Sequence, residues 1–309
     1  MNHIDTADFY GPHVVNEIIR EALAPYDGVN IVTKVGSVRD ENGNWPHARS
    51  PRELREQVES NLKTLGVEAL DVVNLRLGGG PDGHSPVAGS LPESFGALAE
   101  LRKQGKIKHL GLSVVNADQV AEAQTIAPIV TVQNWYNVAH RGHEDLIAEL
   151  SGKGVAYTAF WPLGGFNPLQ SSTLDAVAAR LDTTPKAIAI AWLLHRSPNM
   201  IVIPGTSKVA HLRENLAAAD LGSPLMLSPS WTASRYDKDR QTPRGSVLGM
   251  CTQYSEYIGL CNESASSSAD LLSPLKGADT TGSRIVTVCI GTGDDMLAHR
   301  VDTLSAESR

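Results

Sequence analysis

Near its start the chain carries the stretch Asn2-His3-Ile4-Asp5-Thr6-Ala7-Asp8-Phe9-Tyr10-Gly11 (residues 2–11), in which a short apolar run is followed by a carboxylate and a phenol. We interpret residues 3–4 as a buried strand that ends at Asp5, with Tyr10 on the turn before a helix. A cation held by Asp5 would favour the phenolate form of Tyr10 and lower its pKa from the usual ~10. The alternative is that Asp5 caps the turn and Tyr10 packs, and these residues alone favour that alternative.

Short apolar runs alternate with helical patterns from this stretch to about residue 220. Near-continuous apolar runs are typical of buried parallel strands, and their alternation with helices predicts a parallel sheet covered by helices. The predicted strands are residues 3–4, 30–35, 70–75, 109–114, 129–135, 156–161 and 200–204. The predicted helices are residues 14–23, 51–65, 91–104, 117–125, 144–151, 174–181, 185–195 and 209–219.

The ends of the predicted strands carry most of the candidate functional residues. Seven strands in this order predict an α/β fold, a (β/α)8 TIM barrel whose remaining strand would have to precede Met1. The chemistry of such barrels lies at the C-terminal ends of the strands. Five of the seven ends are polar or charged, although a purely structural strand would continue apolar; the ends are Asp5, Lys34, Arg76, Ser113, Gln133, Phe160 and Gly205.

Composition and charge exclude several classes of protein. The chain has 309 residues, 41% of them hydrophobic and 20% charged, with a net charge of −7. No basic run is interleaved with aromatic residues, which argues against nucleic acid, and no apolar run has the length of a membrane span. Met1 leads directly into the predicted strand, so we expect no signal peptide. The three cysteines suggest no disulfide framework, the histidines have no metal-binding spacing, and a cytoplasmic, metal-free protein is predicted.

Residues 223–309 differ in character from the rest of the chain. They are rich in Ser, Thr, Gly, Asp and Pro and show no sustained period. We therefore predict a barrel domain over residues 1–222 and a low-complexity, disordered tail over residues 223–309. One piece, Arg284-Ile285-Val286-Thr287-Val288-Cys289-Ile290, resembles a strand before a Gly-x-Gly loop, but the third glycine of a dinucleotide motif is absent, and this piece is given no weight.

Six motifs occur in one order along the chain. They are Ile4-Asp5-Thr6-Ala7-Asp8-Phe9-Tyr10-Gly11, Val32-Thr33-Lys34, Leu70-Asp71-Val72-Val73-Asn74-Leu75, Gly111-Leu112-Ser113, Val132-Gln133-Asn134-Trp135-Tyr136-Asn137, and Ile203-Pro204-Gly205-Thr206-Ser207 followed by Glu214-Asn215. Together they resemble the aldo-keto reductases over residues 2–220. The phrases around residues 70–76 and 160–166 resemble a bacterial branch that reduces pyridoxal.

This resemblance implies a metal-free (β/α)8 barrel that reduces carbonyl groups with NADPH or NADH. It implies that Tyr10 gives a proton to the carbonyl oxygen, that Lys34 supplies the cation, and that Asp5 holds Lys34. Arg76 stands at the fourth catalytic position, which is usually histidine. It is interpreted either as polarising the carbonyl or binding an anionic or phenolic oxygen of the substrate, or as a structural arginine that pairs with an acidic loop residue.

The resemblance also implies a cofactor site, with one departure. Ser113 and Gln133 match two residues that cradle the nicotinamide carboxamide, but Val114 replaces the third, an asparagine, and offers no side-chain hydrogen bond. Phe160 stands where a ring stacks on the nicotinamide, although it could equally be a core residue. The remaining cofactor candidates are Gly205, Thr206 and Ser207 for phosphate at a helix start, Lys208 and Arg213 for a 2′-phosphate and hence NADPH, and Glu214 and Asn215 on the adenine side. Lys208 fits a solvated helix-start lysine equally well.

The predicted function is the NAD(P)H-dependent reduction of an aldehyde or ketone to an alcohol, with pyridoxal as the leading substrate and a small carbonyl compound as the only predicted partner. Family members begin with a further strand and helix, so the resemblance implies that these are missing and that two sheet edges are exposed. Two alternatives stay open. One is a non-catalytic member that binds the nucleotide as a sensor or scaffold, suggested by Arg76 and Val114. The other is a truncated product without activity.

Overall fold

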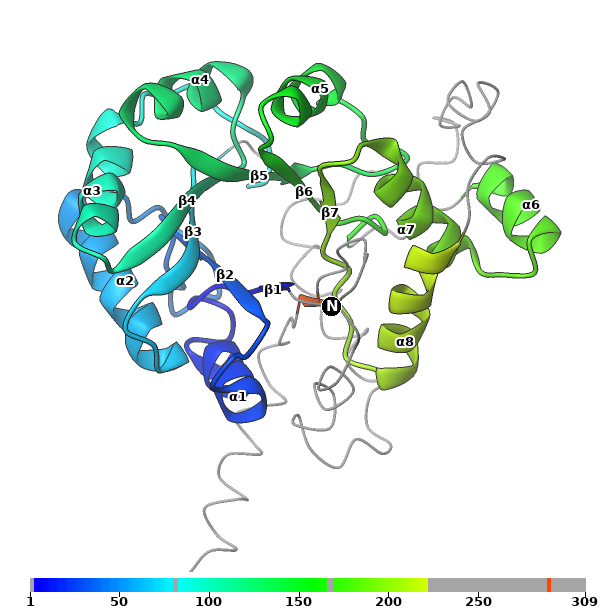
Figure 1. The fold of residues 1–309 in the computed structure, drawn as a ribbon, viewed down its shortest axis with the longest axis horizontal. Coiled ribbons are helices and arrows are strands. Elements are labelled where there is room, and N and C mark those ends of the chain that lie inside the picture. The colour runs from blue at the N-terminus through cyan, green and yellow to red at the C-terminus, as the bar shows by residue number, and fades with distance from the viewer. Residues whose placement is uncertain (1–2, 80–82, 166–168, 170, 222–287, 290–309) are drawn as a thin grey trace, which may run out of the picture.

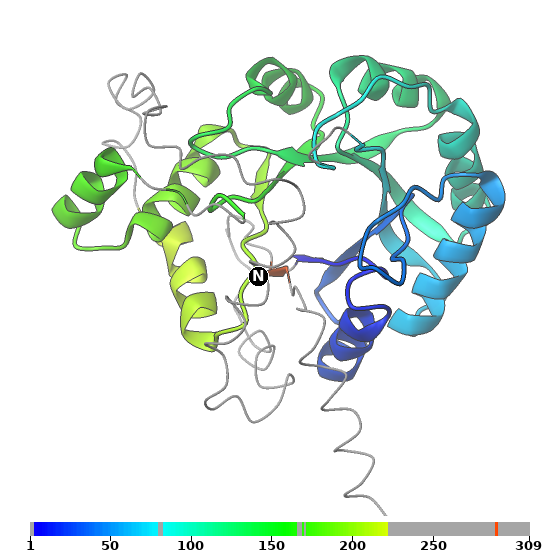
Figure 2. The same ribbon diagram turned by 180° about the vertical axis from the view of Figure 1, so that it is seen from behind.

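The computed structural model describes residues 3–79, 83–165, 169, 171–221 and 288–289. Seven parallel strands alternate with helices and curl into a half-barrel, with the helices outside the curve in both views (Figures 1 and 2). The strands are β1 (His3–Asp5), β2 (Asn30–Val35), β3 (Leu70–Arg76), β4 (Ile107–Ser113), β5 (Ile129–Trp135), β6 (Ala156–Phe160) and β7 (Met200–Val202). The helices are α1 (Val14–Leu23), α2 (Pro51–Leu65), α3 (Pro92–Lys103), α4 (Ala117–Ile126), α5 (Glu144–Gly152), α6 (Ser172–Arg180), α7 (Pro185–Arg196) and α8 (Val209–Ala217), followed by a 3-10 turn, η1 (Ala218–Asp220).

The predicted parallel sheet and its order of strands and helices are confirmed, with small differences at the strand ends. Val114 and Trp161, predicted as the last residues of their strands, have φ values of 60° and 51°. These lie in the left-handed region, which an extended strand does not use. The chain therefore leaves the sheet one residue earlier at β4 and at β6, and Val114, as a β-branched residue, is an unusual occupant of this conformation.

Helix α2 illustrates how local sequence determines an element. The side chain of Ser50 accepts from the backbone N–H of Glu53 while the Glu53 side chain accepts from the N–H of Ser50, a complete capping box. At the other end, Gly66 with a φ of 68° terminates the helix. The face turned to the sheet carries the buried apolar residues Leu54, Val58, Leu62 and Leu65.

Within the described residues the sheet continues past β1. The order is β7-β6-β5-β4-β3-β2-β1-β8, where β8 is Val288–Cys289, and every neighbouring pair is parallel. Ile4 pairs with Val288 and Asp5 with Cys289. The prediction that β1 exposes its outer edge is therefore wrong, because a strand that sequence patterning had discounted supplies the missing backbone partners. The rest of the predicted tail, residues 223–287 and 290–309, lies outside the described residues.

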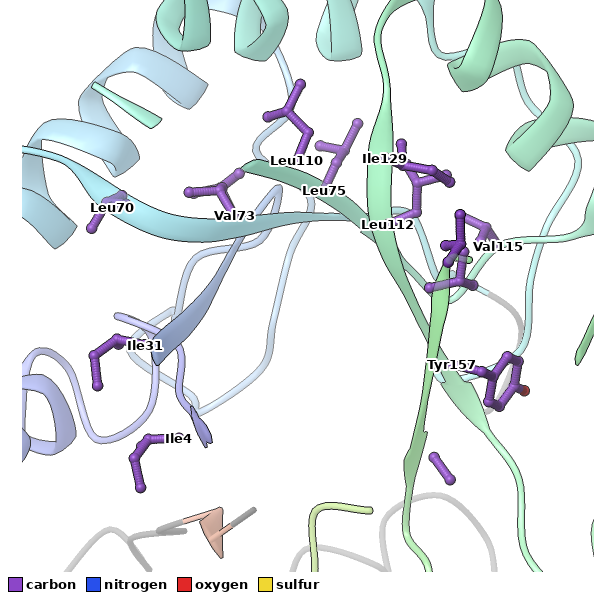
Figure 3. Close-up of a cluster of buried hydrophobic side chains, with 14 of the residues drawn as sticks. Ile4, Ile31, Leu70, Val73, Leu75, Leu110, Leu112, Val115, Ile129 and Tyr157 are labelled. Carbon is purple, nitrogen blue, oxygen red and sulfur yellow. The ribbon is translucent and has the colours of Figure 1, made fainter. Parts of the chain in front are cut away.

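The two faces of the strands differ in polarity. Val73 and Leu75 of β3 belong to the large buried hydrophobic cluster that also contains Leu54 and Phe95 of the surrounding helices (Figure 3). Asn74 between them and Arg76 after them are buried but polar, as are their neighbours on other strands. Successive side chains of a strand point to opposite faces, so the helix-covered face is apolar and the inner face is polar. The buried polar residues at these alternate positions are His3, Asp5, Lys34, Asn74, Arg76, Ser113, Thr131, Gln133 and Thr158. None of the described helices is long and apolar enough to cross a membrane.

Candidate active site

The polar strand ends come together at one end of the curled sheet. Lys34 pairs in register with Asn74, Arg76 with Ser113, and Ser113 with Gln133. Parallel strands in register end at the same level, so side chains that are far apart in sequence lie together at the C-terminal ends of the strands. We call this end of the half-barrel its mouth. The candidate residues Lys34, Arg76, Ser113 and Gln133 thus lie at neighbouring strand ends of β2 to β5.

A buried ion pair joins Asp5 at the end of β1 to Lys34 on β2. The exposed fractions of the two side chains are 0% and 3%, and the ammonium group donates to Asp5 Oδ1 and, at 2.9 Å, to the carbonyl oxygen of Thr6. Gln133 Nε2 donates to the second carboxylate oxygen at 2.7 Å. Both oxygens of Asp5 are therefore engaged. Removing either charge would leave its partner buried and uncompensated, which typically costs about 3–5 kcal/mol.

The opposite face of the same two strands is held by a network of neutral side chains. Thr6 Oγ1 donates to Asn16 Oδ1 of α1 at 2.8 Å, and Thr33 Oγ1 donates to Asn61 Oδ1 of α2 at 2.6 Å. Asn16 Nδ2 donates to Asn61 Oδ1 at 3.2 Å and so links the two halves. Thr6 and Thr33 each adjoin one member of the ion pair in sequence. The network therefore ties both strand ends to the helices behind them and positions Asp5 and Lys34 relative to each other. Neither asparagine was identified from the sequence.

Tyr10 lies on the turn between β1 and α1, close to the ion pair. The Lys34 ammonium lies 5.1 Å from the centroid of its ring. The Tyr10 ring packs edge-on against Phe9, with centroids 5.2 Å apart, and against Trp45 at 5.7 Å. The carboxylate, ammonium and phenol predicted from strand ends and the first turn are thus adjacent. This contact with Lys34 distinguishes the arrangement from a turn in which Tyr10 only packs.

Arg76 ends β3 with an exposed fraction of 8%. Its Nη2 donates to the carbonyl oxygen of Gly83 at 2.8 Å and lies 3.5 Å from His84 Nδ1, while its guanidinium carbon is 5.5 Å from the centroid of the Trp45 ring. Burial lowers the pKa of Arg76, and the negative charge that Tyr10 carries as a phenolate opposes this shift. Among the described residues no carboxylate forms an ion pair with Arg76. Whether it pairs with an acidic residue of the loop at 80–82, which lies outside the described residues, stays a prediction.

Two further basic side chains lie near Arg76. Arg49 Nη2 donates to the carbonyl oxygens of Leu77 and Gly78, at 2.6 and 2.9 Å, just past the end of β3. Burial, and then the charge of Arg76, lower the pKa of Arg49 to about 10. Burial followed by the charges of both arginines lowers the pKa of His47. The local field at this mouth is therefore strongly positive.

The residues predicted to contact the nicotinamide lie at the ends of β4, β5 and β6. Ser113 is fully buried, and its hydroxyl has no hydrogen-bond partner in the described part of the chain. Gln133 engages Asp5, as described above. Val114 donates through its backbone N–H to the Gln133 carbonyl at 2.9 Å, while its side chain offers no polar atom. Phe160 is half-buried, with its ring centroid 6.2 Å from that of His84.

The phosphate candidates follow β7, which forms the end of the sheet remote from β1 and β8. Gly205, Thr206 and Ser207 precede α8, whose first turn has Lys208 as N-cap residue without a side-chain cap. Glu214 accepts a hydrogen bond from Thr184, the N-cap residue of α7. Arg213 is exposed, and Asn215 is buried. The roles of these residues in cofactor binding stay predictions.

Three aromatic residues near the site were given no functional role from the sequence: Trp45 and His84, which lie in loops after strand ends, and Trp161, which was predicted as the last residue of its strand. Trp45, His84 and Trp161 come from the loops after β2, β3 and β6. His84 contacts both rings, with centroids 6.4 Å from Trp45 and 4.2 Å from Trp161. Barrel-top loops commonly carry function, and the two tryptophans within such loops were the available signal. The described residues contain no group of three or more side chains that could hold a metal ion.

Comparison with known proteins agrees with this architecture. The profile described as "Aldo/keto reductase family" matches residues 1–225. Pyridoxine 4-dehydrogenase of Escherichia coli (strain K12) is 59% identical over 222 residues, which are 72% of this chain and 77% of that protein. An uncharacterized oxidoreductase of Schizosaccharomyces pombe (strain 972) is 39% identical over 224 residues, covering 72% of this chain and 70% of the relative.

Solved structures share the fold. A thermostable aldo-keto reductase in complex with the inhibitor epalrestat is 30% identical, with a TM-score of 0.61, over 75% of this chain and 80% of that one. An aldo-keto reductase of Klebsiella pneumoniae in complex with NADPH is 22% identical, with a TM-score of 0.63, over 79% and 84% of the two chains. The second comparison supports the fold alone.

Proposed function

This chain belongs to the aldo/keto reductase family and is an oxidoreductase, and we propose that it reduces an aldehyde to the primary alcohol with NADPH, with pyridoxal as its substrate. The observation that carries the proposal is the buried Asp5–Lys34 pair beside Tyr10. The choice of substrate rests on the 59% identical pyridoxine 4-dehydrogenase. The choice of NADPH rests on Lys208 and Arg213 at the start of α8, which would meet a 2′-phosphate.

In this mechanism Tyr10 donates the proton that the carbonyl oxygen requires as the carbon is reduced. When Tyr10 gives up its proton it becomes an anion. The ammonium of Lys34, 5.1 Å from the centroid of the Tyr10 ring, would stabilise that anion. A full positive charge about 5 Å away is worth on the order of 3 kcal/mol at an effective dielectric constant of ~20. Asp5 keeps Lys34 charged in its buried position, and Gln133 orients Asp5. Bound NADPH would supply the hydride.

The residues present fit a nicotinamide group. The buried hydroxyl of Ser113 has no partner among the described residues, and a carboxamide offers both a donor and an acceptor for it. Phe160 would give the nicotinamide an aromatic wall. Gly205, Thr206 and Ser207 would meet phosphate oxygens with backbone N–H groups, and Lys208 and Arg213 would meet a 2′-phosphate. Val114 contributes no side-chain hydrogen bond, so carboxamide recognition would rest on Ser113 and Gln133.

The test is to purify the chain, titrate NADPH by quenching of tryptophan fluorescence, and follow the loss of NADPH absorbance with pyridoxal. Tyr10→Phe is expected to lower kcat by about 10²–10⁴-fold, as loss of a general acid does, while NADPH still binds. Tyr157→Phe is the matched control. Its hydroxyl is buried without a partner in the described residues, and its ring lies on the helix-covered face, so turnover should be unchanged. NADPH binding without turnover by the unmodified chain would instead support a nucleotide-binding protein that is not a reductase.

A further inference from the structure

A band of aromatic rings crosses the mouth of the half-barrel. Successive ring centroids are 5.7 Å apart from Tyr10 to Trp45, 6.4 Å from Trp45 to His84, 4.2 Å from His84 to Trp161, and 5.1 Å from Trp161 to Trp135. These five rings come from five different loop or strand segments. They share no single helix or strand, so local packing of one element does not explain their alignment. Such a band suits a flat, aromatic ligand.

The cationic group of Arg76 lies beside this band. Its contacts in the described residues are a backbone carbonyl, an imidazole nitrogen and the face of Trp45, all of which are neutral when His84 is neutral. Its hydrogen bonds within the described residues use Nη2 alone, so the Nε and Nη1 edge of the guanidinium has no hydrogen-bond partner in this part of the chain. A buried charge is costly unless it is paired. The nearby Arg49 adds positive charge, so the ligand group that this edge of Arg76 favours is an anion.

We propose that Arg76 binds the ionised hydroxyl group of an ortho-hydroxy aromatic aldehyde and thereby selects this class of carbonyl substrate. In such a compound the aldehyde oxygen and the phenolate oxygen lie side by side on one ring. A planar guanidinium fork matches two adjacent oxygens, which a lysine or a histidine does not. Tyr10 then approaches the aldehyde oxygen from the other side, and the aromatic band holds the ring. Pyridoxal, with its hydroxyl next to its aldehyde, belongs to this class.

The proposal rests on the carbonyl reduction proposed above, and a set of four aldehydes separates the two. Benzaldehyde tests reduction itself. Salicylaldehyde adds the ortho hydroxyl, 2-methoxybenzaldehyde blocks its ionisation, and 4-hydroxybenzaldehyde moves it away from the aldehyde. For the unmodified chain we expect kcat/KM for salicylaldehyde to exceed the values for the last two by about 10- to 100-fold, the worth of a hydrogen bond to a charged group. This preference should grow as pH rises through the ionisation of the salicylaldehyde phenol.

Variants of Arg76 test whether this side chain causes the preference for salicylaldehyde. Arg76→Gln and Arg76→Lys should both reduce the ratio of kcat/KM for salicylaldehyde to kcat/KM for 2-methoxybenzaldehyde to within about 3-fold. Arg52→Gln is the control, because Arg52 is exposed on α2 and pairs only with Glu56 in the described residues. If the variants fail to fold, the aldehyde series on the unmodified chain still decides the matter. Equal kcat/KM for all four aldehydes, or a preference that survives both Arg76 variants, would overturn the inference and leave the reductase function standing. Failure to reduce any aldehyde would overturn both.

Discussion

Replacement of Asn61 tests whether the network behind β1 and β2 stabilises the catalytic strands. Asn61 is fully buried, accepts from Thr33 at 2.6 Å and from Asn16 at 3.2 Å, and donates to the Gln57 carbonyl at 2.8 Å. Asn61→Ala removes all three bonds. Asn16 Nδ2 still donates to Asp8 Oδ1 at 3.1 Å and to Thr64 Oγ1, but the Thr33 hydroxyl loses the only side-chain partner it has among the described residues.

The expected cost follows from these contacts. Neutral hydrogen bonds contribute about 1 kcal/mol each, and an orphaned buried hydroxyl costs about 1–3 kcal/mol. Alanine recovers about 0.5 kcal/mol through its helix propensity. We therefore expect Asn61→Ala to lower the free energy of unfolding by about 3.5–5.5 kcal/mol. For a chain of this size, this corresponds to a Tm lower by about 7–20 °C.

A double-mutant cycle isolates the Thr33–Asn61 contact. Thr33→Val removes the donor and leaves no orphaned hydroxyl, so in the Asn61→Ala background it should cost less than alone, or nothing. The predicted coupling is about 1–2 kcal/mol by urea denaturation. Glu56→Ala on the exposed face of α2 is the control and should change stability by less than about 0.5 kcal/mol. If the two changes in the free energy of unfolding add within about 0.5 kcal/mol, the Thr33–Asn61 hydrogen bond does not stabilise the fold. The network would then not hold β1 and β2 against the helices.

Three further predictions concern single sites. Lys34→Met should lower kcat at least about 100-fold and destabilise the fold by about 3–5 kcal/mol, because Asp5 is left buried and uncompensated; near-normal turnover in the NADPH assay would contradict the proposed mechanism. Burial lowers the pKa of His3 to about 4, so the neutral imidazole favours the folded state above about pH 6.5, and we expect about 3 kcal/mol to be lost as pH falls from there through about pH 4. Urea midpoints measured across this range should be flatter for His3→Phe, and equal slopes would show that His3 is not the titrating group. Gly111→Ala should cost at least about 1–3 kcal/mol in thermal unfolding, because its Cβ would lie 2.1 Å from Asn74 Oδ1, whereas Gly96→Ala, with nothing within 4 Å, should be neutral or stabilising.

The helices and strands could be predicted because their signals are local. The apolar run at residues 129–135 and the capping box at Ser50 and Glu53 each lie within one element, and both elements have the predicted bounds. Strand ends were misplaced where a residue takes positive φ, as Val114 and Trp161 do. Nothing in an apolar side chain signals that backbone conformation, because it is imposed by the loop that follows.

The pairing of Asp5 with Lys34 was also within reach of the sequence, since neighbouring parallel strands bring their ends to one level. Other partners were not. Gln133 reaches Asp5 across 128 positions of sequence, and it does so only because the curl of the sheet brings β5 opposite β1. The pairing of Val288 with Ile4 likewise could not be predicted from local sequence. A two-residue strand forms only where the unpaired edge of another strand offers backbone hydrogen-bond partners.

Sequence by itself therefore determined which residues form strands and helices and which polar side chains stand at strand ends, because side-chain periodicity and capping act over a few residues. Only the tertiary structure decided which of those side chains touch, which rings line the mouth, and that Arg76 lies beside Trp45 and His84. The physical reason is that such contacts depend on the curvature and register of the whole sheet and on loops that follow different strands. Distances of a few ångströms between them are set by packing across the entire half-barrel, which no local pattern encodes.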